Sequence, residues 1–192
     1  MQYKKKYIND KILEAGLAEY LDKGFRQANI SAIAQNAGVP VGNLYRYFDG
    51  KAGLLDALVK NTYHEVPKIV EQLARSHVDT GLPLSETLRR LTKSLSDLCE
   101  ERGKGILVLA DKCVSTRYED FSDKIIEQVG ELIYHHLYAD EEKMSRFMST
   151  LMAKALVHSM FDILRLNLSR AETETMVLKT MRFYFCEIET RK

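Results

Sequence analysis

The chain has 192 residues, of which 45% are hydrophobic and 29% charged, a balance typical of a globular protein that can build its own core. Its longest uninterrupted apolar run, Ile106 to Ala110, has five residues, whereas a membrane-spanning helix needs about 20. We therefore expect no membrane partner. Three widely separated cysteines without a paired spacing indicate reduced thiols and a cytoplasmic location; they are Cys99, Cys113 and Cys186.

The net charge of +1 does not by itself indicate a nucleic-acid partner. Residues 1–60, however, hold nine Lys and Arg against six Asp and Glu, whereas residues 61–192 hold nineteen against twenty-one. A positive N-terminal segment on a weakly acidic remainder is typical of a DNA-facing head. Simple solvation of these charges explains the same numbers, so the pattern leaves both interpretations open.

Apolar residues recur at spacings of three and four throughout, which predicts an all-α fold of about nine helices. The first helix follows the stripe from Ile8 to Leu21 and ends at Gly24. Short helices are expected over about 30–36, with Asn29 as N-cap, and over about 40–48. A fourth runs from Lys51 into the seventies, and a fifth follows Pro83 and ends before Gly103.

The remaining helices are predicted from their start signals. A sixth helix holds Ile106–Ala110, and acidic residues at 140–142 open an eighth. Two capping boxes, Thr116-x-x-Glu119 and Ser169-x-x-Glu172, are expected to open the seventh and the ninth.

The last two predicted helices are densely apolar. A helix that is apolar all round is buried on every side, and a second copy of the chain would cover these two helices most easily. A self-contained core is the alternative. The residues expected at a dimer interface are Leu151, Ala155, His158, Ser159, Met181 and Phe185.

Residues 24–55 carry the functional signal. Two short helices around Gly38 describe a helix-turn-helix, whose second helix enters the major groove of DNA. Leu44 and Phe48 share the face that packs inward, which leaves polar and aromatic side chains for base edges and phosphates. Many helical proteins with this geometry never touch DNA, so spacing alone does not decide the function.

The same segment resembles the tetracycline-repressor-like (TetR) family of transcriptional regulators. The resemblance rests on Gly24-Phe25, Ala37-Gly38-Val39, Gly42, Leu44-Tyr45, Tyr47-Phe48, Lys51 and Leu54-Leu55. It implies a homodimer that represses transcription from a palindromic operator until a small molecule releases it. It also implies an N-terminal three-helix DNA-binding domain over 1–50 and a helical domain for effector binding and dimerisation over 51–192.

The resemblance assigns DNA contacts residue by residue. Val41, Asn43 and Tyr45 are expected to reach bases or sugars. Tyr47 and Lys51 are expected to contact phosphate, Ser31 likewise, and Arg46 belongs to the same exposed face. The sequence departs from the family where an acid usually follows the cap of the second helix, because Ala32 stands there. The reciprocal capping box is therefore expected to be lost.

The effector site is the least defined part. Tyr63, Cys99, Cys113 and Tyr134 are candidate lining residues, although ordinary core packing explains each of them. Seven Met and seven Phe indicate adaptable apolar walls, hence an apolar or aromatic effector. The histidine spacings predict no metal site, no cofactor motif is found, and the absence of catalytic motifs argues against an enzyme. A protein-interaction module of the same fold, without effector-controlled operator binding, is the alternative function.

Overall fold

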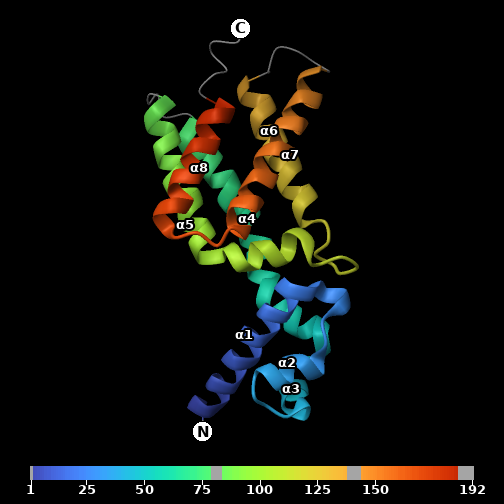
Figure 1. Ribbon diagram of the computed structural model, residues 1–192. Coiled ribbons are helices and arrows are strands. Elements are labelled where there is room, and N and C mark those ends of the chain that lie inside the picture. The colour runs from blue at the N-terminus through green and yellow to red at the C-terminus, as the bar shows by residue number, and fades with distance from the viewer. Residues whose placement is uncertain (1, 79–83, 138–143, 186–192) are drawn as a thin grey trace. The chain divides into compact units, whose positions relative to one another are not determined.

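The computed structural model of the protein describes residues 2–78, 84–137 and 144–185. Over these ranges the chain folds into α-helices and contains no strand, as predicted (Figure 1). The eight described helices are α1 (Gln2–Gln27), α2 (Ile30–Asn36), α3 (Val41–Tyr47), α4 (Gly50–Val78), α5 (Leu84–Asp111), α6 (Phe121–Leu137), α7 (Met144–Arg165) and α8 (Arg170–Phe185).

The helices form two compact units. Unit 1 comprises the chain up to His64 together with Lys104–Phe121, and unit 2 comprises Glu65–Gly103 and the chain from Ser122 onward. Unit 1 thus holds α1, α2, α3, the first part of α4 and the end of α5. These compact units do not test the predicted division into a DNA-binding domain over 1–50 and an effector-binding domain over 51–192, which stays a prediction.

Helix α1 is interrupted at Gly24, as the sequence predicted. Gly24 has φ 70° and ψ 169°, a backbone region that glycine enters without the steric cost of a Cβ. One further turn follows, closed by a hydrogen bond from the Ala28 N–H to the Gly24 carbonyl at 3.0 Å. The Phe25 N–H points elsewhere and donates to the carbonyl of Lys112 at 2.8 Å. The change of direction at Gly24 therefore allows a hydrogen bond between the end of α1 and the residue that follows α5.

The predicted break between a fifth and a sixth helix is wrong. The chain continues as one helix, α5, through Gly103 and Gly105. These glycines make room for neighbours: a Cβ on Gly103 would lie 2.8 Å from Leu164 Cδ2, and one on Gly105 would lie 2.9 Å from Thr62 Oγ1. Close packing between helices, and not a turn, is what the two glycines serve. The described ranges consequently hold eight helices where about nine were predicted.

The two predicted capping boxes have different outcomes. At α8 the box is confirmed, because the Ser169 N–H donates to Glu172 Oε2 at 2.9 Å and the Glu172 N–H donates to Ser169 Oγ at 3.4 Å. The Ser169 hydroxyl also donates to Glu172 Oε2 at 2.6 Å. The pKa of Glu172 is lowered by these bonds. At the other box, Glu119 Oε2 accepts from the Ser115 N–H at 2.9 Å. It thereby shapes a turn ahead of α6, which begins only at Phe121. The acidic start predicted at 140–142 lies outside the described residues.

Unit 2 is organised around an apolar cluster from α5, α7 and α8. Its buried members are Leu88, Leu156, Ile163, Val177 and Met181. The stretch Arg146–Arg165 of α7 is long and apolar enough to cross a membrane by length and composition alone, with a mean hydropathy of 1.2. Because α7 contributes Leu156 and Ile163 to this cluster, we read it as a bundle helix.

Helix α5 carries two unpaired hydroxyls inside unit 2. Thr92 and Ser96, one turn apart, are each 2% exposed, and their hydroxyl oxygens have no hydrogen-bond partner among the described residues. A buried hydroxyl without a partner costs free energy because water solvates it in the unfolded chain.

Replacing Thr92 by Val keeps the branched shape and removes the unpaired oxygen. We expect the free energy of unfolding to rise by about 1–2 kcal/mol, measured by urea denaturation. Thr150→Val is the control, since the exposed Thr150 hydroxyl donates to the Arg146 carbonyl at 2.9 Å, and it should change stability by less than about 0.5 kcal/mol. A less stable Thr92→Val variant would contradict this account.

Candidate nucleic-acid interface

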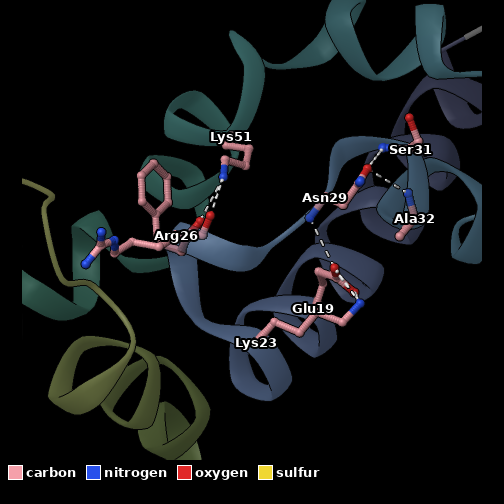
Figure 2. A network of polar contacts seen from close by, with 8 residues as sticks. Glu19, Lys23, Arg26, Asn29, Ser31, Ala32 and Lys51 are labelled. Carbon is pink, nitrogen blue, oxygen red and sulfur yellow. Dashed lines mark hydrogen bonds and ion pairs between the residues drawn. The ribbon is translucent and has the colours of Figure 1, made fainter.

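Helix α2 begins at a side-chain cap. Asn29 has extended backbone angles, and its Oδ1 accepts hydrogen bonds from the N–H groups of Ser31 at 2.8 Å and Ala32 at 3.4 Å (Figure 2). These N–H groups have no partner inside the helix. The predicted N-cap is therefore confirmed.

The missing half of the capping box is supplied by another helix. In a capping box the acid three residues into the helix accepts the N–H of the cap residue, and Ala32 cannot do so. Glu19 of α1 takes its place, because its Oε1 accepts the Asn29 N–H at 3.1 Å (Figure 2). This carboxylate is only 5% exposed, and Lys23 of the same helix pairs with it at 2.9 Å. The sequence did not indicate Glu19, since ten residues separate it from Asn29.

The environment of Glu19 favours its charged form. Burial raises the pKa of this carboxyl, but the hydrogen bonds from the Lys23 ammonium and the Asn29 N–H outweigh burial and lower the pKa below the ordinary value of 4.5. The group that accepts the Asn29 N–H is therefore an ionised carboxylate at neutral pH.

The turn between α2 and α3 uses one left-handed residue. Gly38 has φ 67°, and the Val39 N–H returns to the Ala34 carbonyl at 3.0 Å. Pro40 then stands as the N-cap of α3 in an extended conformation, and its carbonyl accepts the Asn43 N–H at 2.9 Å. The geometry is that of the predicted helix-turn-helix.

Helix α3 divides into a buried and an open face. Leu44 is fully buried, as predicted. Val41 is 38% and Tyr45 60% exposed, and Arg46 is also exposed. A Cβ on Gly42 would meet nothing within 4 Å apart from its chain neighbours and the backbone of α3 itself. The helix therefore presents a bare surface in which even the backbone is accessible.

The other predicted DNA contacts lie around this surface. Asn43 and Tyr47 are half-buried, and Ser31 is exposed at the start of α2. The structure thus brings Ser31, Val41, Asn43, Tyr45, Arg46 and Tyr47 onto the helix-turn-helix. Their contacts with DNA remain predictions.

Lys51 makes contacts within the protein that the sequence did not indicate. Its ammonium donates to the carbonyls of Phe25 at 2.9 Å and Arg26 at 3.2 Å (Figure 2), and it lies 5.0 Å from the centre of the Phe25 ring. Its own carbonyl accepts the Tyr20 hydroxyl at 2.8 Å. Lys51 therefore binds the end of α1 to the start of α4, and its contact with phosphate stays a prediction.

The four candidate effector residues are divided between the two units. Tyr63 and Cys113 belong to unit 1, and Cys99 and Tyr134 belong to unit 2. The Tyr63 hydroxyl donates to Asp120 at 2.9 Å, and the Arg146 guanidinium lies 4.3 Å from the centre of the Tyr134 ring. Their role in binding an effector is still a prediction.

The two described cysteines have thiols of low reactivity. Burial raises the pKa of the Cys99 thiol to about 11. Burial also raises that of Cys113 to about 11, against a hydrogen bond with Thr116 that lowers it. Thiols of this kind stay protonated at neutral pH. Both are free thiols; Cys113 is buried, as predicted, whereas Cys99 is only half-buried. Cys186 lies outside the described residues.

The predicted interface residues of α7 and α8 differ in exposure. On α7, Leu151 is 44% exposed, Ala155 and His158 are exposed, and Ser159 is half-buried. On α8, Met181 is buried in the cluster of unit 2, against which the half-buried Phe185 packs. The exposed members of the predicted set therefore lie on α7, and the part of all six residues in dimerisation stays a prediction.

Comparison with known proteins agrees with this geometry. Residues 12–58 match the model of bacterial regulatory proteins of the tetR family. The chain is 33% identical over 87 residues to the "Probable HTH-type transcriptional regulator YttP" of Bacillus subtilis (strain 168). It is 32% identical over 136 residues to the "Uncharacterized HTH-type transcriptional regulator YvdT" of the same organism. These alignments cover 45% and 70% of the chain, but only 42% and 63% of the two relatives.

The fold is similar over a greater length. A TetR-like transcriptional regulator from Rhodococcus sp. RHA1 superposes with a TM-score of 0.58 at 21% identity, covering 91% of this chain and 93% of that one. Residues 12–58 therefore carry the helix-turn-helix segment of the tetR family, and the helices of the chain adopt the fold of a TetR-like regulator.

The Glu19 cap predicts a pH-dependent loss of stability. Glu19→Gln removes the charge that Lys23 and the Asn29 N–H stabilise, and we expect it to lower the free energy of unfolding at pH 7 by about 1–3 kcal/mol. Because the pKa of Glu19 is lowered on folding, its contribution is complete above the unfolded pKa and is lost as pH falls through the folded one.

Urea denaturation between neutral pH and pH values below the lowered pKa checks both statements. The wild type and Glu19→Gln should converge in stability on the acid side. Glu14→Gln, at an exposed position of α1, should follow the wild type throughout. A gap that stays constant across the acid range would rule out the carboxylate as its source.

Proposed function

We propose that the protein is a sequence-specific DNA-binding transcriptional regulator that acts as a repressor. The observation that carries this proposal is the open face of α3, where Val41, Tyr45 and Arg46 surround an uncovered Gly42. A recognition helix lies deep in the major groove and needs such a surface, bare of its own protein.

The residue types on this face suit DNA. Arg46 can bind a guanine edge or a phosphate, Asn43 can bind an adenine edge with two hydrogen bonds, and Tyr45 and Tyr47 offer hydroxyls to the backbone. A well-formed contact of Arg46 with guanine or of Asn43 with adenine discriminates against a wrong base by about 1–3 kcal/mol.

We further propose that the regulator is a homodimer. Phe147 and Leu151 lie one turn apart on α7 and are 61% and 44% exposed, and the exposed Ala155 continues the row. An isologous contact along this row would cover it. A dimer carries two copies of α3, and paired recognition helices of this kind read half-sites about 34 Å apart, which is why the operator is expected to be a palindrome.

Release from the operator is proposed to follow the binding of a small apolar or aromatic molecule. Such a ligand must bind the released arrangement more tightly than the DNA-bound one, because a ligand with equal affinity for both shifts nothing. Tyr63, Cys99, Cys113 and Tyr134 remain the candidate residues.

Selection of genomic fragments by the purified protein tests the proposal. We expect a recovered palindrome whose affinity falls steeply with salt. Tyr45→Ala should leave the thermal midpoint unchanged and weaken operator binding at least about tenfold, and Asn43→Ala should relax the preference at one base pair of each half-site. A folded protein that enriches no sequence and shows no salt dependence would support the interaction-module alternative instead.

The dimer is tested by a charge on the α7 row. Leu151→Glu should give a folded monomer in analytical ultracentrifugation, because an unpaired carboxylate cannot be buried at an apolar contact without several kcal/mol of cost. Val114→Glu, at a position 51% exposed in unit 1, should stay dimeric. A monomeric wild type would contradict the proposed assembly.

A further inference from the structure

Two buried hydroxyls of α5 differ from other helical hydroxyls of unit 2. Thr92 and Ser96 are each 2% exposed, and neither hydroxyl oxygen has a hydrogen-bond partner among the described residues. A helical hydroxyl can donate to the carbonyl four residues earlier, and those of Thr150, Ser159 and Thr175 do so at 2.9, 2.7 and 2.9 Å. Thr92 and Ser96 make no such bond, so two donors remain free inside unit 2.

The two hydroxyls lie on one side of α5. Residues four apart in a helix are neighbours, with Cβ atoms about 5–6 Å apart. Gly103 continues this side two turns later, and a Cβ there would lie 2.8 Å from Leu164 Cδ2 of α7. Another buried side-chain atom without a described partner is Arg102 Nε, but helical spacing places Arg102 about 120° around the axis from Ser96. The hydroxyls therefore form a pair that faces the neighbouring helix, and Arg102 is not part of it.

The surroundings of the pair are apolar. Leu88, one turn before Thr92, is a buried member of the cluster of unit 2, and burial raises the pKa of the Cys99 thiol, three residues after Ser96. Unpaired hydroxyls in such surroundings lower stability, and departures of this kind are concentrated at functional sites. Two neutral donors match a neutral ligand, because a buried carboxylate would need a positively charged partner.

We propose that Thr92 and Ser96 bind the carbonyl oxygen of a neutral, mainly apolar small molecule. A carbonyl oxygen has two lone pairs, and two O–H···O bonds of about 2.8 Å that meet at one oxygen can join hydroxyls one helical turn apart. The inference rests on the proposed function, since this molecule would be the effector. It names two binding residues that the sequence did not indicate.

The site must open to admit the molecule. Protein atoms cover both hydroxyl oxygens in the described structure, so a ligand reaches them only when neighbouring side chains move. The molecule therefore binds an altered arrangement around α5 more tightly than the described one. A difference in affinity between two arrangements is what an effector needs in order to shift the equilibrium between them.

The test measures binding to the full chain without DNA, by isothermal titration calorimetry. The probes are alkyl benzoates from ethyl to hexyl, the alkylbenzenes of equal length, which lack the carbonyl, and the benzoate anion. The test variant combines Thr92→Val with Ser96→Ala. The control combines Thr175→Val, at an exposed position of α8, with Ser94→Ala, at a half-buried position on the opposite side of α5.

The wild type should bind at least one ester more tightly than the alkylbenzene of equal length. The test variant should reduce this preference at least about tenfold, because it removes both hydrogen bonds to the carbonyl. It should bind the alkylbenzene at least as tightly as the wild type does, since no buried donor is then left unpaired against the ligand. The control should keep the preference, and the thermal midpoint of the test variant should not fall, because unpaired buried hydroxyls are lost.

Three results would overturn the site: a wild type that binds no ester, a wild type that binds the benzoate anion more tightly than the esters, and a test variant that keeps the preference. None of them touches DNA binding, which the selection of genomic fragments measures. A wild type that prefers the esters but enriches no genomic sequence would instead refute the proposed regulator and leave the ligand site standing.

Discussion

The helix-turn-helix unit depends on one charge placed at the end of a helix. The Lys51 ammonium binds two carbonyls in the last turn of α1, where the helix dipole concentrates negative charge. Since the Tyr20 hydroxyl holds the Lys51 carbonyl in return, the first turn of α4 is fixed to α1 from both sides. Helix α3 ends only a few residues earlier, so these contacts also fix the position at which the chain leaves α3.

The same junction extends to α5. Phe25 lies between Lys51, which binds its carbonyl, and Lys112, whose carbonyl accepts its N–H. A few residues on, Tyr118 and Arg117 both bond to Asp56 of α4. The segment after α5 therefore contacts α1 at one point and α4 at another, and any displacement of this segment would act on both helices that carry α2 and α3.

Patterns in the sequence predicted the structural features that depend on residues close together in the chain. The helical period indicated the fold class, Gly24 and Asn29 marked the end of one helix and the start of the next, and Ser169 with Glu172 marked the last. Glu19 was missed because its partner is reached through the tertiary fold. Gly103 and Gly105 were misread because a glycine that ends a helix and one that admits a neighbour look alike in sequence.

The candidate sites differ in the same way. The exposed face of α3 follows from helical spacing and the burial of Leu44, so its residues could be named in advance. The role of Lys51 could not be named in advance, because the sequence does not distinguish a lysine that binds carbonyls from a lysine that binds phosphate. Met181 is enclosed by its own chain, and its place at an interface stays a prediction, because apolar density alone does not say which chain covers a residue.

The environments of Cys99 and Cys113 have a consequence for how the protein responds to oxidants. With a pKa of about 11, roughly one thiol in ten thousand is a thiolate at pH 7. Peroxide reacts with the thiolate, so Cys99 and Cys113 would be oxidised very slowly. Cys99 and Cys113 are therefore poorly suited to sense the redox state of their surroundings.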